Sequence, residues 1–518
     1  MLNSPIEGSP DKVEIQEAKV PMAPRGSGCL IYVSDPSSIA GGVLPDPVEA
    51  DDLRRWIDML ADSGVDIFQQ DIYAQGFTFY WRSDRFEYGG REQHQRFLPL
   101  LDAGIQPLQL LLDHSHKRGM AFVAGFRMND NHGGEHFPAA ADFIASHPEC
   151  RLSDPGEAHD PDQRMLDFTF DEVRQFVFEV MEEVVNRFDV DGIEMTFRED
   201  MYFPVPSGKE RAPLMTALVR RLRGMLDEHS QSRRRRIKLG ARVYATLEEC
   251  LYLGLDVPTW IAEGLIDCLS PMDPMFSYFN APYEEFAALT RQSECMLYPG
   301  MAPWSSQGAR KRIHFTAERH VPGSASMTRS NDRALAHTFY GAGADGISIY
   351  NHFVGHLWPP PFYPQALQVF RELRDPQRVA RGDRHYVFDP TRDDETHFAH
   401  HRQRIVLDRS AMKPSGVFRF RLYEQRDLVH QATLMVRGNL TRYDEVDVQL
   451  NGVPLATGPL GKHDDRYLRP FPNIRWYPVP IAAMAWGENQ LNITLEVADP
   501  ETTGEIVIDE VEIWVEPE

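Results

Sequence analysis

DGIEMTFR, residues 191–198, is a short apolar run that directly follows an amphipathic segment, Asp171–Arg187, in which apolar residues recur at helical spacing. A helix followed at once by a run of strand length is typical of parallel strands joined by crossover helices. Because side chains alternate along a strand, Glu194, Thr196 and Arg198 share one face. The run therefore predicts a strand, Gly192–Phe197, that is walled by helices on one side and carries polar groups on the other.

The same alternation extends along the chain in both directions. The other expected strands are Cys29–Val33, Val65–Gln70, Ala121–Phe126, Ile237–Val243, Leu265–Ser270, Met296–Gly300 and Gly346–Tyr350. The other expected helices are Asp51–Ala61, Pro107–Arg118, Ala212–Glu228, Thr259–Glu263 and Asp332–Gly341. About eight strand–helix units predict a (β/α)8 barrel. A doubly wound open sheet is less favoured, because no Gly-rich phosphate turn follows Val33.

The residues after about 380 have a different pattern. Short alternating strands are expected at Val417–Leu422, Ala432–Val436, Glu445–Leu450, Asn492–Val497 and Ile506–Val515, with turns such as Asn451-Gly452 between them. This is the pattern of a small antiparallel β-sandwich. We expect an N-terminal extension over 1–27, a barrel over 28–380 and a sandwich over 381–518.

Composition excludes several classes of partner. The formal charge is −23, with 77 acidic against 54 basic residues, which disfavours broad contact with nucleic acid or an anionic membrane. Five widely separated cysteines lack C-x-x-C spacing, so neither a disulfide framework nor a zinc site is indicated. The N-terminus has no basic segment followed by an apolar one. The expected location is cytoplasmic, although a processed secreted form would look the same, and no cofactor is expected.

In a barrel the functional groups lie at the carboxyl ends of the strands. The polar residues at these predicted ends are Asp35, Asp71, Arg127, Asn129, Asp130, Glu194, Arg198, Glu199, Arg242, Tyr244, Asp273, Trp304, Tyr350 and Asn351. Glu194 is the most notable, because a buried carboxylate needs a partner or a function.

Residues 191–198 resemble the DGIELDFxR motif of uncharacterised glycoside-hydrolase-like (β/α)8 barrels, which are distantly similar to family 18 chitinases. The segments FRMND (126–130), GARVYAT (240–246), GLDVPTWIAEGLID (254–267) and GADGISIYN (343–351) resemble further parts of those barrels. The resemblance covers about 28–375 and implies a glycosidase. It departs from the pattern where Thr196 replaces an Asp and Arg198 stands at the acid position of the chitinases, so the chitinase mechanism does not carry over.

Glycosidic cleavage needs two carboxyl groups that flank the bond. We expect Glu194 to be one of them and Asp273 the other, with Glu199 as the substitute and Asp35 or Asp71 behind it. Three arginines at neighbouring strand ends, Arg127, Arg198 and Arg242, favour a uronic or sulfated sugar, because the Arg fork binds such groups in a bidentate way. The alternative is that each arginine pairs with a nearby acid.

The pocket is expected to be shaped by Asn129, Asp130, Tyr244, Trp304, Tyr350 and Asn351. Aromatic residues after the second and eighth strands suit stacking on sugar rings. The histidines of DNHGGEH (130–136) are not favoured as metal ligands, because Gly133-Gly134 rules out a helix there.

Two other functions stay open at this point. One is a carbohydrate-binding pseudoenzyme, and the other is a barrel lyase or isomerase that acts on uronic acids. The sandwich resembles galactose-binding-like jelly rolls. We expect it to brace the barrel rather than to bind sugar, because its sequence indicates no exposed aromatic row beyond Tyr467, Trp476 and Tyr477. The chain could form a homo-oligomer.

Overall fold

The protein is described from a computed structural model. The described residues are 28–130, 132, 139–153, 164–197, 201–273, 276–302, 327–352, 365–391, 403–458 and 473–517. Within this part of the chain, no helix is both long and apolar enough to cross a membrane.

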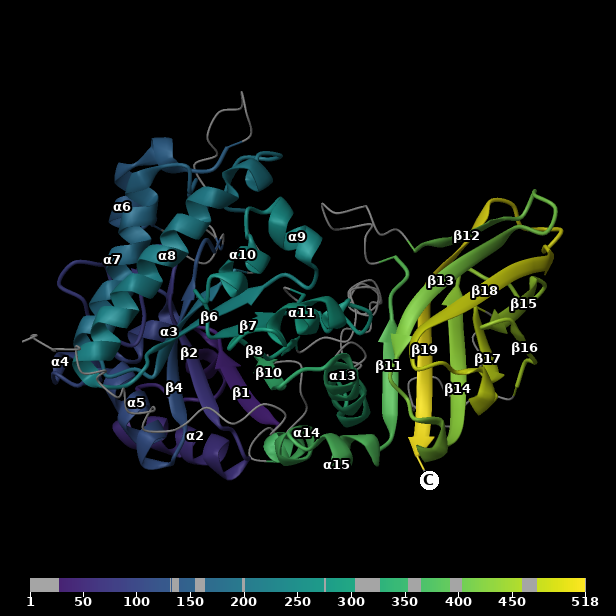
Figure 1. The fold of residues 1–518 in the computed structure, drawn as a ribbon, viewed down its shortest axis with the longest axis horizontal. Coiled ribbons are helices and arrows are strands. Elements are labelled where there is room, and N and C mark those ends of the chain that lie inside the picture. Colours follow the sequence, from purple (N-terminus) through teal and green to yellow (C-terminus); the bar gives the residue numbers. More distant parts are fainter. Residues whose placement is uncertain are drawn as a thin grey trace, which may run out of the picture.

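The N-terminal half is a barrel of parallel strands (Figure 1). Its strands are β1 (Cys29–Ser34), β2 (Ile67–Ala74), β4 (Ala121–Arg127), β5 (Gly192–Thr196), β6 (Lys238–Val243), β7 (Cys268–Pro271), β8 (Met296–Leu297), β9 (Gly300–Met301) and β10 (Gly346–Tyr350). β8 pairs with β7 and β9 pairs with β10, so the sheet closes through residues 296–301. The strand expected at Met296–Gly300 is divided because Pro299 has no N–H for the ladder. A short β3 (Phe77–Thr78) pairs antiparallel with β2.

Helices cover the outside of the barrel (Figure 1). They are α1 (Ser38–Gly42), α2 (Ala50–Asp62), α3 (Glu92–Gln95), α4 (Leu98–Asp102), α5 (Pro107–Lys117), α6 (Asp142–Ser146), α7 (Asp171–Arg187), α8 (Gly208–Arg233), α9 (Leu247–Tyr252), α10 (Val257–Ala262), α11 (Tyr283–Thr290), α13 (Arg329–Ala342), α14 (Phe370–Leu373) and α15 (Pro376–Ala380). The (β/α)8 prediction is confirmed.

Four aspartates brace the amino-terminal end of the barrel in the same way. Each comes directly before a strand, and its carboxylate accepts the backbone N–H of a residue on an earlier strand. The pairs are Asp66 with Leu30, Asp191 with Phe122, Asp267 with Leu239 and Asp345 with Leu297, at 2.8–2.9 Å. The backbone N–H of each aspartate donates in return to the carbonyl of that same residue, at 2.7–3.0 Å. The Asp of the DGIEMTFR stretch is therefore a structural brace at the floor of the barrel.

We predict that Asp345→Ala lowers the free energy of unfolding by about 2 kcal/mol, because the substitution leaves the buried N–H of Leu297 without its acceptor. Chemical denaturation of the full chain would measure this. Asp84→Ala, at an exposed loop position, is the control and should change stability by less than about 0.5 kcal/mol. Equal stability of the two variants would contradict the bracing role.

The C-terminal part is a pair of antiparallel sheets, as predicted. One contains β11 (Arg384–Phe388), β12 (Ile405–Asp408), β14 (Val429–Gly438), β17 (Ile474–Pro478) and β19 (Glu505–Pro517); the other contains β13 (Ser415–Leu422), β15 (Glu445–Leu450), β16 (Val453–Leu455) and β18 (Gly487–Val497). Phe388 of the first sheet packs on Phe420 of the second, with ring centroids 4.9 Å apart. The expected division after residue 380 falls between α15 and β11 and stays a prediction.

The sandwich lies against α11 and α13 of the barrel (Figure 1). The Asn280 side chain donates to the carbonyl of Arg419 and accepts from the N–H of Arg421, and the Asn331 amide donates to the carbonyl of His385. At the same junction Arg384 forms a bidentate pair with Glu424, at 2.7 Å for both bonds. These contacts agree with the bracing role expected for the sandwich.

Candidate active site

The inward face of β2, β4 and β5 carries two carboxyl groups at one level of the barrel. In the register of the sheet Asp71 lies opposite Gly125, and Gly125 lies opposite Glu194. A Cβ at Gly125 would fall 1.9 Å from Oδ1 of Asp71. The glycine therefore leaves the space in which the two carboxyl groups approach each other.

The Gln69 amide connects the two carboxyl groups. Its Nε2 donates to Oε1 of Glu194 at 2.6 Å and to Oδ1 of Asp71 at 3.3 Å. Since both oxygens are bonded to one nitrogen, they lie no more than about 6 Å apart. This upper limit is compatible with the separation of about 5–5.5 Å in retaining glycosidases and lies below the inverting range of about 6.5–9.5 Å.

Glu194 is held in an ion pair inside the barrel. Arg242 of β6 donates its Nε to Oε1 of Glu194 at 3.0 Å, and another of its nitrogens donates to the Ser348 hydroxyl at 2.8 Å. Arg242 is fully buried and Glu194 is 2% exposed. Arg242 therefore places a buried positive charge directly beside the Glu194 carboxyl group, and the loss of either partner would leave the other buried without its counter-charge.

The surroundings of Asp71 favour the protonated form of its carboxyl group. Burial raises the pKa of its carboxyl most, and the charge of Glu194 raises it further; Arg127 and Arg242 partly offset these effects, and the pKa is about 7. Its Oδ2 has no hydrogen-bond partner in the described part of the chain. Asp71 thus keeps its proton up to about neutral pH, as a general acid must.

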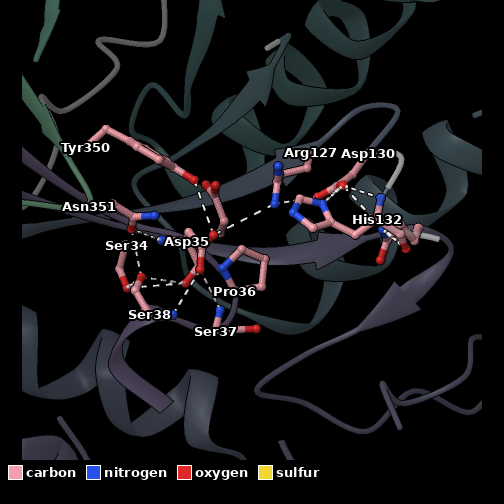
Figure 2. Close-up of polar contacts among 12 residues, drawn as sticks. Ser34, Asp35, Pro36, Ser37, Ser38, Arg127, Asp130, His132, Tyr350 and Asn351 are labelled. Carbon is pink, nitrogen blue, oxygen red and sulfur yellow. Dashed lines mark hydrogen bonds and ion pairs between the residues drawn. The ribbon is translucent and has the colours of Figure 1, made fainter. Parts of the chain in front are cut away.

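A chain of charged side chains lies at the mouth of the barrel, where β1 and β4 end (Figure 2). Oδ1 of Asp35 accepts the backbone N–H groups of Ser37 and Ser38 at 2.8 and 2.9 Å. Its Oδ2 lies 3.4 Å from the Tyr350 hydroxyl and 3.8 Å from Arg127. The Asp35 side chain is 22% exposed, whereas Arg127 is 5% exposed. Asp35 is therefore more open to solvent than the arginine beside it.

Asp130 completes this chain. It forms an ion pair with Arg127 and a close contact with His132, and Figure 2 shows the three side chains in a row. Burial alone would raise the pKa of Asp130, but Arg127 and His132 outweigh it and hold the pKa well below its usual range. This ion pair fixes the guanidinium of Arg127 between two carboxylates.

Asn351 locks the loop that carries Asp35. Its Oδ1 accepts the backbone N–H of Asp35 at 3.0 Å and the Ser38 hydroxyl at 2.7 Å. The backbone of Asn351 has φ +45°, a conformation that a residue other than glycine rarely adopts. Such strain is typical of functional sites, where surrounding contacts maintain it.

Residues 41–218 match the family model described as Glycosyl hydrolase-like 10. The match covers less than half of the chain but includes Asp71, Arg127 and Glu194. No curated protein sequence matches the chain.

Solved structures with a distant likeness to the chain carry glycosidase or related names. A cycloisomaltooligosaccharide glucanotransferase of a Paenibacillus species, complexed with cycloisomaltoheptaose, is 10% identical, covers 93% of this chain and 57% of its own, and has a TM-score of 0.34. The α-L-fucosidase isoenzyme 2 from Paenibacillus thiaminolyticus is 12% identical, and the alignment covers 68% of this chain and 48% of the fucosidase, with a TM-score of 0.41. The α-galactosidase AgaB from Geobacillus stearothermophilus is 10% identical, and the alignment covers 95% of this chain and 55% of the galactosidase, with a TM-score of 0.35. The chain spans less than two thirds of each of them.

Several other predicted site residues lie outside this constellation. The Asn129 amide is used by the backbone, since it donates to the carbonyls of Leu166 and Met201 and accepts the N–H of Leu166. Asp273 accepts the N–H of Phe276 at 2.9 Å and is not among the groups bonded to Glu194. Tyr244 is nearly buried in the main core. Glu199, Arg198 and Trp304 lie outside the described residues.

Sequence reasoning did not include Gln69 or Ser348 in the site. Gln69 precedes Asp71 by two positions, so the alternation of a strand places both on the inward face, and this signal was sufficient to find it. Ser348 likewise precedes Tyr350 by two positions on β10, so both lie on the same face of that strand. The described residues contain no group of three or more His, Cys, Asp and Glu side chains placed to hold a metal ion.

Proposed function

We propose that this chain is a glycoside hydrolase that cleaves O-glycosidic bonds with retention, with Asp71 as the acid and base and Glu194 as the nucleophile. The single observation that supports this is the Gln69 amide bonded to both carboxyl groups, one with a pKa of about 7 and the other in an ion pair. The glycosyl hydrolase-like match over residues 41–218 agrees with it.

In the first step Asp71 gives its proton to the leaving oxygen while a Glu194 oxygen forms a bond to the anomeric carbon, and the glycosidic bond breaks. In the second step the ionised Asp71 takes a proton from water, the water oxygen bonds to the anomeric carbon, and Glu194 leaves as a carboxylate. Because Asp71 is fully buried, a substrate reaches it only when the mouth groups above it rearrange.

The direct test is turnover of a panel of aryl glycosides and neutral and anionic oligosaccharides by the full chain, with Glu194→Gln as the inactive reference. Hydrolysis by the native chain alone supports the proposal. Binding without turnover would instead favour the second candidate, a carbohydrate-binding pseudoenzyme. The observation that favours this candidate is that Gln69, Thr196 and Arg242 all bond to the Glu194 carboxyl group. An unsaturated product that absorbs in the ultraviolet would identify a lyase.

An anionic substrate is a further part of this proposal, and the argument for it now rests on Arg127. Arg242 is fully buried and bonded to Glu194, whereas Arg127 lies beside the partly exposed Asp35. If a substrate carboxylate or sulfate replaces Asp130 as the partner of Arg127, Arg127→Gln should lower kcat/KM on anionic sugars by about tenfold more than on neutral ones. Equal losses on both would show that Arg127 only braces the mouth.

A further inference from the structure

A cavity lies between the barrel and the sandwich, away from the mouth. It has a volume of about 530 Å³ and is lined by both parts of the chain: by His337, Tyr340 and Gln377 from α13 and α15, and by Gln425, Leu428 and Trp486 from the sandwich. Tyr340 is near the end of α13, which leads into the start of β10, whereas the candidate active site lies at the strands' carboxyl ends. The cavity is therefore near the opposite end of the barrel.

Trp486 is presented to this cavity on a fixed turn. Its side chain is 56% exposed, which is unusual for so large an apolar group. The buried Asn489 amide donates to the carbonyls of Ala485 and Gly487 and accepts the N–H of Ala485, at 2.8–2.9 Å. The turn thus holds an exposed indole in one place, which lowers the entropic cost of using it for binding.

The ring of Trp486 is braced on its barrel side. Tyr423 meets it edge to face, with centroids 5.5 Å apart and an interplanar angle of 77°. Tyr423 in turn packs against α13, where a Cβ at Gly341 would fall 2.3 Å from its side chain, and its hydroxyl donates to Glu284 at 3.1 Å. The two parts of the chain therefore fix the indole together.

Polar side chains that suit hydroxyl groups surround the indole. Gln377, Arg381 and Gln425 are exposed at the cavity, and their side chains make no hydrogen bond or ion pair within the described residues. Deeper in the wall, His337 contacts the Tyr386 hydroxyl at 3.2 Å. An exposed aromatic ring beside two amides and a guanidinium matches a sugar ring, which has an apolar face and a hydroxylated edge.

We propose that this cavity is a second carbohydrate site, which binds one pyranose unit stacked on Trp486, with hydroxyl groups bonded to Gln377, Gln425 and Arg381. The volume lies within the range of ligand pockets, about 300–1,000 Å³. The site does not depend on the proposed hydrolysis, because it shares no residue with the mouth. It gives the sandwich a binding role in addition to bracing.

Calorimetry tests this with maltohexaose, cellohexaose and chitohexaose as probes, on the full chain in a Glu194→Gln background that prevents turnover. At least one probe should bind, Trp486→Ala should weaken that binding about tenfold or more, and Trp486→Tyr should retain most of it. Gln425→Ala should weaken it less. Tyr443→Ala removes an equally exposed aromatic residue elsewhere on the sandwich and is the control.

Binding that is unchanged in Trp486→Ala, or absent for all three probes, would overturn the second site. Hydrolysis of an aryl glycoside by Trp486→Ala with its active-site residues intact distinguishes the two proposals. Normal hydrolysis with lost oligosaccharide binding supports a separate site, whereas parallel loss of both would place the indole in the catalytic function and contradict it.

Discussion

Glu194→Gln is expected to lower kcat by about 10⁴-fold or more, because the neutral amide cannot attack the anomeric carbon. The amide is nearly isosteric, and its oxygen can still accept from Gln69 and Arg242, so the variant should fold. The measurement is the steady-state rate on the best glycoside of the panel. Azide should restore part of the rate of Glu194→Ala by supplying an anion in place of the carboxylate.

Glu424→Gln is the matched control for this substitution. Glu424 is also a buried carboxylate in an ion pair with an arginine, Arg384, but it lies at the junction between the barrel and the sandwich. It should lower thermal stability while leaving kcat within about twofold of the native value. If Glu194→Gln retained most of its activity, the nucleophile would have to be another carboxylate, with Asp35 as the first to test.

Asp71→Asn is expected to lower kcat/KM by about 10²–10⁴-fold, the usual contribution of a general acid. The pH dependence carries a second expectation. Because burial and the Glu194 charge raise the pKa of Asp71 to about 7, its acid form is lost as the pH rises through that value. The native rate should therefore fall on the alkaline side of about pH 7, and this limb should be absent in the residual activity of Asp71→Asn.

Asp332→Asn is the control that shows whether the alkaline fall in rate comes from Asp71 or from another buried carboxyl group with a similar pKa. Asp332 of α13 is also fully buried, and burial raises its pKa to about 7, with Arg333 opposing the shift. Its substitution should leave the alkaline limb in place. An alkaline limb that disappears in Asp332→Asn but persists in Asp71→Asn would contradict the assignment of the acid.

The barrel could be predicted from sequence because its strands and helices are encoded locally. The segment Asp171–Arg187 is a helix with the predicted bounds, and the strand after it begins at Gly192, as predicted. Periodicity and alternation depend on neighbouring residues only. The division of the strand around Pro299 could also have been read locally, since proline has no N–H.

The pairing of carboxyl groups could not be predicted in the same way. Asp71 and Glu194 meet because the sheet register places Gly125 between them, and this register is a long-range property. The sequence favoured Asp273 as the partner because it follows a strand end, and that assignment stays a prediction. The raised pKa of Asp71 depends on burial and on Glu194, neither of which a motif encodes.

The aromatic residues of the sandwich show the same limit. Trp476 and Tyr477 were the expected exposed aromatics, but both are buried, because Tyr477 packs in the main core and Trp476 packs with Met435 and Trp514. That expectation was wrong for these two residues, and Tyr467 lies outside the described part of the chain. The exposed aromatic at the cavity is Trp486, whose exposure follows from the turn that Asn489 holds.

The anomeric configuration of the first product tests the central claim most directly. Proton NMR during the first turnovers of the best glycoside would record it before mutarotation. With Asp71 and Glu194 oxygens no more than about 6 Å apart, we predict that the product has the same configuration as the substrate. A product of inverted configuration would require more widely separated carboxyl groups and would contradict Asp71 and Glu194 as the catalytic pair.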